Sequence, residues 1–243
     1  MTAPDAAQSA RRSSPTDDSR IGGAGASSER QRAPELKTTR PIGLAPGAPE
    51  AAAGQDAKKY ATANPVVQRL LARWMGRLRG VLGPVDGTVI DVGVGEGLAL
   101  ERMIDGHPAI GLEYRVDKVL LARERLPKLA GAVADAGMLP VIDGAGDLVT
   151  CIELLEHLEP FDPAVAELAR ITGGRLVVSV PWEPWFRLGN LGRGKNLRRL
   201  GNDPEHVQAF TPRRLHRALE RHYSEVRVVK AFPWLIAEAR RPR

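Results

Sequence analysis

Two carboxylates and an imidazole stand at helical spacing near the middle of the chain: Glu153, Glu156 and His157. If a helix begins at the first of them, the three side chains occupy positions i, i+3 and i+4 and share one face. With a fourth group, His206, they could bind a divalent ion: oxygen ligands suit Mg²⁺ or Mn²⁺, and imidazole also admits Zn²⁺. Without a metal, His157 or His206 could act as the general base that removes the proton of an attacking hydroxyl.

A second segment with chemical potential is rich in glycine. It runs from Asp91 to Gly97, with Gly93 and Gly95 between them, and it follows an apolar run directly. Glycines at such a turn let the backbone pass close to a ligand and adopt positive φ. A dinucleotide-binding turn of the G-x-G-x-x-G type would need its third glycine where Leu98 stands, so the spacing favours another ligand.

Acidic residues end the apolar runs that follow. Glu113 ends the second expected strand, Asp135 the third, and Glu153 the fourth. In an open α/β sheet the ligand lies over the carboxyl ends of the strands, so these acids should face one crevice together with Asp91. A carboxylate at the end of the second strand can accept hydrogen bonds from both hydroxyls of a ribose.

The glycine turn resembles motif I of the class I S-adenosylmethionine (SAM) methyltransferases, and Asp135 begins an acid-x-x-x-Leu-Pro sequence that resembles another motif of that family. The resemblance implies SAM as the cofactor. It also implies that Asp135 meets the adenine amino group, that apolar neighbours sandwich the ring, and that Asp91 holds the turn or the ammonium group. The cofactor-binding residues expected are Asp91, Gly93, Gly95, Gly97, Glu113, Asp135, Ala136 and Glu153.

The Glu-x-x-Glu-His pattern with a distal histidine is similar to two O-methyltransferase families. One acts in ubiquinone biosynthesis, and the other methylates the 3′-terminal 2′-hydroxyl of small RNAs. In both, the resemblance implies a metal that binds and acidifies the hydroxyl to be methylated, here on Glu153, Glu156, His157 and His206. Methyltransferases that use no metal also carry Leu-Glu-His-Leu after the fourth strand, where the acid and histidine cap a helix or close the cofactor pocket. Both alternatives stay open.

The elements that must position these residues alternate along the chain. We expect strands at 88–92, 109–113, 131–134, 147–152 and 175–180, and helices at 65–78, 96–105, 116–126, 163–171 and 211–222. This rhythm predicts βαβ units in a parallel sheet covered on both faces. Two further strands, 225–229 and 232–239, follow closely on each other. The fold class implied is α/β and Rossmann-like, a seven-stranded, mostly parallel sheet with a C-terminal antiparallel hairpin.

The first 58 residues differ in composition from the rest. They are rich in Ala, Pro, Ser, Gly and Arg and contain no aromatic residue. Such a segment cannot bury enough surface to fold, so residues 1–58 are expected to be a disordered extension or interaction tail, and 59–243 one SAM-dependent methyltransferase domain. No apolar stretch approaches the ~20 residues that span a bilayer. The single cysteine, Cys151, fits a reduced, cytoplasmic protein.

The connection between the fifth strand and the last helix, 181–206, is longer than an ordinary loop and predicts a lid over the substrate. Its apolar wall is Trp182, Trp185 and Phe186, and its basic rim is Arg187, Arg193, Lys195, Arg198 and Arg199. Residues 186–243 carry 14 Lys and Arg against 5 Asp and Glu. This excess of positive charge could bind nucleic acid, a phosphorylated metabolite or an acidic membrane. An arginine-rich coding bias would produce the same excess without any partner.

We therefore expect a SAM-dependent methyltransferase that acts on a small-molecule acceptor, at a hydroxyl oxygen, with His157 and His206 as catalytic candidates. Nucleic acid is disfavoured as a partner because no RNA-binding module is recognisable. Two alternatives from other classes stay open: an RNA 2′-O-methyltransferase with a divalent metal, and a catalytically silent scaffold that binds SAM.

Overall fold

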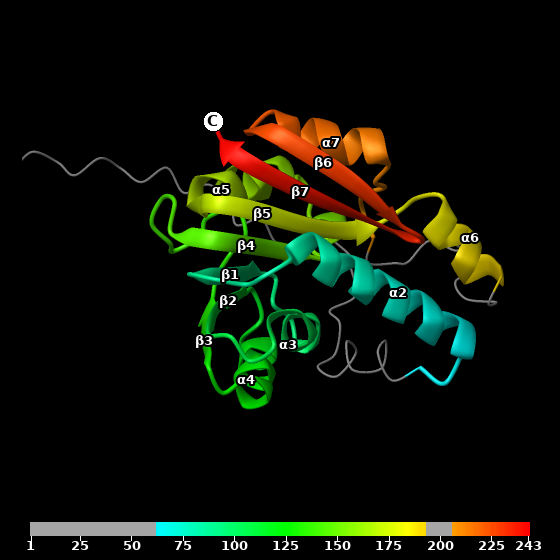
Figure 1. Ribbon diagram of the computed structural model, residues 1–243, viewed down its shortest axis with the longest axis horizontal. Coiled ribbons are helices and arrows are strands. Elements are labelled where there is room, and N and C mark those ends of the chain that lie inside the picture. The colour runs from blue at the N-terminus through cyan, green and yellow to red at the C-terminus, as the bar shows by residue number, and fades with distance from the viewer. Residues whose placement is uncertain (1–61, 193–205) are drawn as a thin grey trace, which may run out of the picture. The chain divides into compact units, whose positions relative to one another are not determined.

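The computed structural model describes residues 62–192 and 206–243, in which one twisted sheet carries helices on both faces (Figure 1). The sheet has seven strands in the order β3-β2-β1-β4-β5-β7-β6 within the described residues. These are β1 (Val89–Val92), β2 (Ala109–Glu113), β3 (Leu129–Val133), β4 (Gly146–Ile152), β5 (Thr172–Pro181), β6 (Tyr223–Ala231) and β7 (Trp234–Pro242). Strands β1 to β5 are parallel, and β7 is antiparallel to both β5 and β6. The expected fold class is confirmed.

Helices precede and connect the strands. They are α2 (Pro65–Leu82), α3 (Leu98–Ile104), α4 (Val116–Arg125), α5 (Asp162–Ile171), α6 (Trp185–Gly192) and α7 (Pro212–Glu220), with a 3₁₀ turn η1 (Leu155–His157) after β4. α2 begins at the expected residue, because the Asn64 side chain accepts the N–H groups of Val66 at 3.0 Å and Val67 at 3.3 Å.

The sheet separates two apolar cores because successive side chains of a strand point to opposite faces. Val149 and Val178 belong to the core that α5 and α7 cover, whereas Leu148 and Val177 belong to the core that α2, α3 and α4 cover. Trp74 anchors α2 in the second core, where its ring stacks on Trp234 of β7 with centroids 4.9 Å apart. The two faces are therefore closed, and the carboxyl edge of the sheet carries the polar side chains predicted for the site.

The structure differs from the sequence prediction in two connections. The segment after β5 was expected to be a loop, but its first part forms α6 after Pro184. A helix that began at Glu153 would have placed Glu153, Glu156 and His157 on one face, but only the short η1 forms after β4. The expected tail and its boundary at residue 58 lie outside the described residues, and within 62–192 and 206–243 no helix is both long and apolar enough to cross a bilayer.

Candidate active site

The glycine turn after β1 passes close to the segment that follows β4. Gly93 has φ 80° and donates its N–H to the Leu112 carbonyl at 2.7 Å. A Cβ at this position would lie 2.9 Å from the Leu154 side chain, so both the conformation and the space require glycine. Gly95 and Gly97 also have positive φ, and α3 begins directly after Gly97.

Glu113 ends β2 and faces this turn. Its Oε2 accepts the N–H of Gly95 at 3.1 Å, and its Oε1 accepts the N–H of Arg115 at 3.0 Å. Each carboxylate oxygen has two lone pairs, so both can accept a further hydrogen bond from a ligand hydroxyl. The side chain thus braces the turn in a position compatible with the predicted ribose contact.

Asp135, two residues beyond β3, has one satisfied and one unsatisfied oxygen. Oδ1 accepts the N–H of Gly137 at 2.8 Å, whereas Oδ2 is shielded from solvent and accepts no hydrogen bond from the described residues. Buried acceptors in proteins normally have a donor, so Oδ2 is suited to an incoming N–H group. The neighbouring Ala136 is half-buried and packs against the core beneath the site.

Asp91 lies inside β1 and is only 2% exposed. Its Oδ1 accepts the hydroxyl of Thr150 on the neighbouring β4 at 2.6 Å. Burial raises the pKa of Asp91 to about 7; the Thr150 hydrogen bond opposes the rise, and the charge of Glu113 adds to it. A ligand cation beside this carboxyl would favour its ionised form.

Glu153 does not belong to the histidine cluster, which corrects the expected metal ligand set. Its φ is 58°, so the chain is left-handed there, and the expected helical face from residue 153 to residue 157 does not exist. Its Oε2 instead accepts the indole N–H of Trp234 at 3.0 Å, and its own N–H binds the Ser179 carbonyl at 2.8 Å. These bonds hold the end of β4 against β5 and β7.

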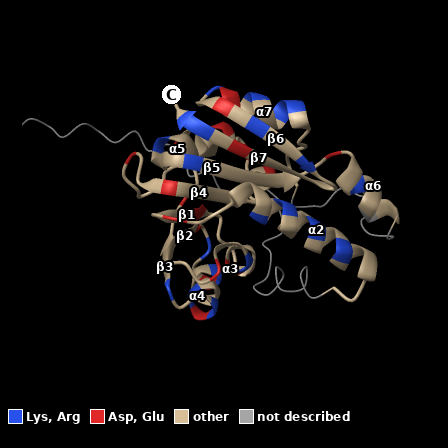
Figure 2. Cartoon of the chain, viewed as in Figure 1, with Lys and Arg blue, Asp and Glu red and all other residues tan. Residues whose placement is uncertain are grey.

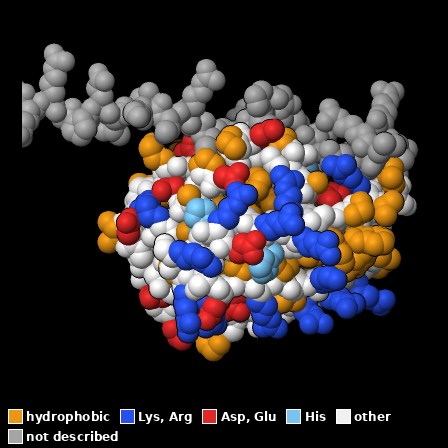
Figure 3. All heavy atoms as spheres, turned by 90° about the horizontal axis from the view of Figure 1, so that it is seen from above, with side chains coloured by type: hydrophobic (Ala, Val, Ile, Leu, Met, Phe, Trp, Pro, Cys, Tyr) orange, Lys and Arg blue, Asp and Glu red, His pale blue; other side chains and the backbone are white. Residues whose placement is uncertain are grey.

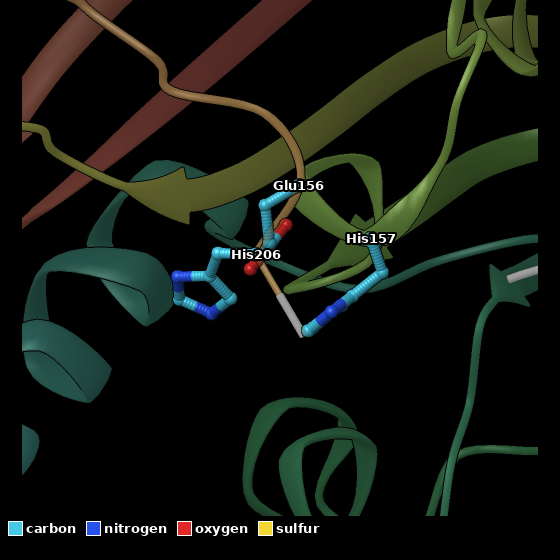
Figure 4. Close-up of side chains that lie close together, drawn as sticks. All are labelled: Glu156, His157 and His206. Carbon is cyan, nitrogen blue, oxygen red and sulfur yellow. The ribbon is translucent and has the colours of Figure 1, made fainter. Parts of the chain in front are cut away.

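Three other predicted residues do come together. Glu156 and His157 on η1 and His206 on the segment leading to α7 each offer a ligand atom, and these atoms all lie within 4.8 Å of one another (Figure 4). The two imidazole rings contact edge to face with centroids 5.2 Å apart. Glu156 is 1% exposed and the two histidines are half-buried.

Backbone hydrogen bonds bring these distant segments together. The carbonyl of Glu156 accepts the N–H groups of Val207 at 3.0 Å and Gln208 at 3.1 Å, which sets His206 beside η1. Phe186 of α6 also lies beside that histidine, with its ring centroid 5.3 Å from the imidazole. The cluster therefore has an aromatic wall next to its polar groups.

Several neighbours of the site were not foreseen or are not described. Trp234 and Thr150 contact predicted residues only because β7 and β4 pair with distant strands, which leaves no local signal in the sequence. In the predicted lid, Arg187 forms an ion pair with the buried Glu183 at 3.5 Å, and burial raises the pKa of Glu183 against the opposing charge of the arginine. The rest of the predicted basic rim lies outside the described residues: Arg193, Lys195, Arg198 and Arg199.

Comparison with known proteins adds independent findings. Residues 90–178, from β1 to β5, match the family model described as a methyltransferase domain. A demethylmenaquinone methyltransferase of Beutenbergia cavernae is 31% identical over 141 residues, which cover 54% of this chain and 59% of that protein. The chain thus spans somewhat over half the length of that relative.

Solved structures share the fold at low sequence identity. The magnesium protoporphyrin IX methyltransferase of Synechocystis, solved with bound SAH, is 16% identical with a TM-score of 0.57; the match covers 76% of this chain and 91% of that one. A possible histamine N-methyltransferase of Thermotoga maritima is 19% identical with a TM-score of 0.57, covering 71% and 88%.

The domain match, the strand order and the glycine turn agree with one another. The match spans the five parallel strands, whose carboxyl ends carry the turn and the acids described above. The structural neighbours share the same layered sheet, and one of them holds SAH. The chain belongs to the class I SAM-dependent methyltransferases.

Proposed function

We propose that this protein transfers the methyl group of SAM to a hydroxyl oxygen of a small-molecule acceptor. The observation that carries the proposal is the placement of His157 and His206, whose rings lie 5.2 Å apart beside the carboxylate of Glu156. η1 follows β4, and β4 is the neighbour of β1 in the sheet. The imidazoles are thus next to the glycine turn, where the methyl-bearing part of the cofactor is expected.

The polar groups at the carboxyl ends of three strands support a pose for SAM. The carboxylate of Asp91 pairs with the ammonium group of SAM. The turn at Gly93 and Gly95 lets the methionine portion of SAM approach the backbone. Glu113 receives the ribose hydroxyls. Asp135 receives the adenine amino group on Oδ2, which is buried and accepts nothing from the described residues.

The acceptor is inferred to be a flat, largely apolar molecule that bears a hydroxyl. Phe186 lies 5.3 Å from His206 and 6.0 Å from Trp234, so aromatic faces line the space beside the imidazoles. The Beutenbergia cavernae relative is named for demethylmenaquinone, a flat and largely apolar quinone, so its name supports the shape and polarity of the acceptor but not the oxygen nucleophile. Because the match covers only 59% of that relative, we propose for this chain the same class of acceptor and not the same molecule.

The chemical step is an in-line displacement. An imidazole of the pair accepts the hydroxyl proton while the oxygen attacks the methyl carbon, and the carbon–sulfur bond breaks with its electron pair passing to sulfur. The products are a methyl ether, a neutral thioether and an imidazolium, which the carboxylate of Glu156 stabilises. Alignment of the three reacting centres supplies much of the acceleration.

The same three residues also fit a divalent cation. One carboxylate and two imidazoles are ligands that Mn²⁺ or Zn²⁺ accept, and three protein ligands leave positions open for the acceptor. Ligand atoms about 2.1 Å from one ion lie no more than about 4.2 Å apart. The ligand atoms of these three residues lie within 4.8 Å of one another, so the side chains would have to draw closer to bind one ion. When bound there, the cation would lower the pKa of the acceptor hydroxyl.

The first prediction concerns the pH dependence of SAM binding. The pKa of Asp91 is raised to about 7 in the free protein, so the carboxyl is largely neutral below that pH. A bound ammonium favours the carboxylate, so affinity should fall by up to about tenfold for each pH unit below about 7. Calorimetric titration from about pH 8 to about pH 6 with the parent and Asp91→Asn measures this. The variant should bind weakly with a flatter profile; parallel profiles for the two proteins would contradict the proposal.

The second prediction concerns the catalytic imidazoles. His206→Ala should lower kcat by about 10² to 10⁴ because a general base contributes this much, while SAM affinity stays near the parent value. His216→Ala is the matched control, because His216 lies on α7 and pairs there with Glu220. The assay follows labelled methyl from SAM into a panel of short-chain hydroquinones. Transfer to total RNA instead would overturn the small-molecule proposal, and equal rates for both variants would remove His206 from the mechanism.

The third prediction concerns the metal. Titration of the protein with Mn²⁺ alone should show one site, and Glu156→Gln and His206→Ala should each weaken it at least about tenfold. Glu153→Gln should leave Mn²⁺ affinity near the parent value, since Glu153 is bonded to Trp234 instead. The absence of binding by Mn²⁺, Mg²⁺ and Zn²⁺ would exclude the metal and leave the imidazoles as bases alone.

A further inference from the structure

We propose that α6 and the β6–β7 turn dock this protein onto the surface of an anionic phospholipid bilayer. The feature concerned is an aromatic patch, defined as Trp182, Trp185, Leu188 and Phe232. The three aromatic rings contact one another edge to face, with centroids 6.1 to 6.4 Å apart. Trp185, Leu188 and Phe232 are 44%, 51% and 46% exposed. Exposed apolar clusters of this kind mark interaction surfaces rather than core.

The sequence of α6 separates an anchored face from this exposed one. Phe186 packs into the core beneath α2 and lies 6.0 Å from Trp234, which fixes the start of the helix. Trp185 and Leu188 stand at i and i+3 and therefore share the opposite, outward face. Hydrophobic side chains gather at this end of the molecule, with Lys and Arg side chains beside them (Figure 3). The patch thus faces outward from the packed side of α6.

One cation contacts the patch, and a separate group of cations lies on α2. Lys230 places its ammonium 5.4 Å from the ring centroid of Trp182. On α2, Arg69, Arg73 and Arg77 repeat at intervals of four and form one exposed stripe on a helix that has no acidic residue (Figure 2). Within residues 62–192 and 206–243 none of these three guanidinium groups forms an ion pair with a carboxylate. The whole chain carries a net charge of +6.

This combination favours a lipid surface over the other possible partners. Tryptophan is enriched where a membrane meets water, because its ring is apolar and its N–H is polar. Lysine and arginine side chains near the interface are attracted to the negative surface charge of anionic lipid. Single-stranded RNA can stack on the aromatic rings and pair with the cations, but it has no favourable contact for the aliphatic Leu188. A bilayer can bind the aromatic, cationic and aliphatic side chains together. The inference does not depend on the proposed methyl transfer.

The test is flotation of the full chain with vesicles. The protein should bind vesicles of equimolar phosphatidylcholine and phosphatidylglycerol and not vesicles of phosphatidylcholine alone. Trp185→Ser combined with Leu188→Ser should weaken the partition coefficient at least about tenfold, because two interfacial apolar contacts are lost. The matched control is Leu120→Ser with Ile142→Ser, two apolar residues that are 59% and 79% exposed away from α6; its binding should equal that of the parent.

A second comparison tests the charges. Changing Arg69, Arg73 and Arg77 to Gln should weaken binding more than changing Arg123, Arg213 and Arg217, which removes the same charge elsewhere. In the unchanged protein, brominated lipid should quench part of the tryptophan fluorescence. Equal loss in both triple variants, absence of quenching, or binding to single-stranded RNA but not to either vesicle would each overturn the proposal.

Discussion

The contact between Gly93 and Leu154 is the constraint on which the site depends. The chain leaves β1 in a left-handed turn, and a Cβ at Gly93 would come within 2.9 Å of the Leu154 side chain. Leu154 directly precedes η1, which carries Glu156 and His157. The glycine turn, proposed to face the cofactor, and η1, proposed to face the acceptor, therefore share one wall. A change in either turn must displace the other, because packed interiors have little free volume.

A chain of buried polar contacts supports this wall from behind. Trp234 stacks on Trp74 and donates its indole N–H to Glu153, and the Trp74 indole N–H donates to the Ser179 hydroxyl at 2.9 Å. These contacts join α2, β5 and β7 to the end of β4. Buried polar groups that are paired in this way position an element closely, since leaving any of them unpaired is costly. Glu153 therefore acts in the fold rather than in the histidine cluster.

The parts of the structure that local chemistry determines could be predicted from the sequence. The glycine turn, the acids at the strand ends and the N-cap at Asn64 each follow from adjacent residues. The helical face that was to join Glu153 to His157 was wrong, because residue 153 adopts φ 58° to bond with Ser179 and Trp234. Those two partners belong to β5 and β7, and pairing between distant strands leaves no mark near residue 153. The same holds for the contact that brings His206 to η1.

The account rests on a cofactor bound over the carboxyl ends of β1 to β3, and Glu113 tests it most directly. Calorimetric titration with SAM should show that Glu113→Gln weakens binding at least about tenfold, because a charge-assisted contact to the ribose is lost. Glu124→Gln, on the exposed face of α4, should bind like the parent protein. Equal affinity for the parent and Glu113→Gln would contradict the proposed cofactor site.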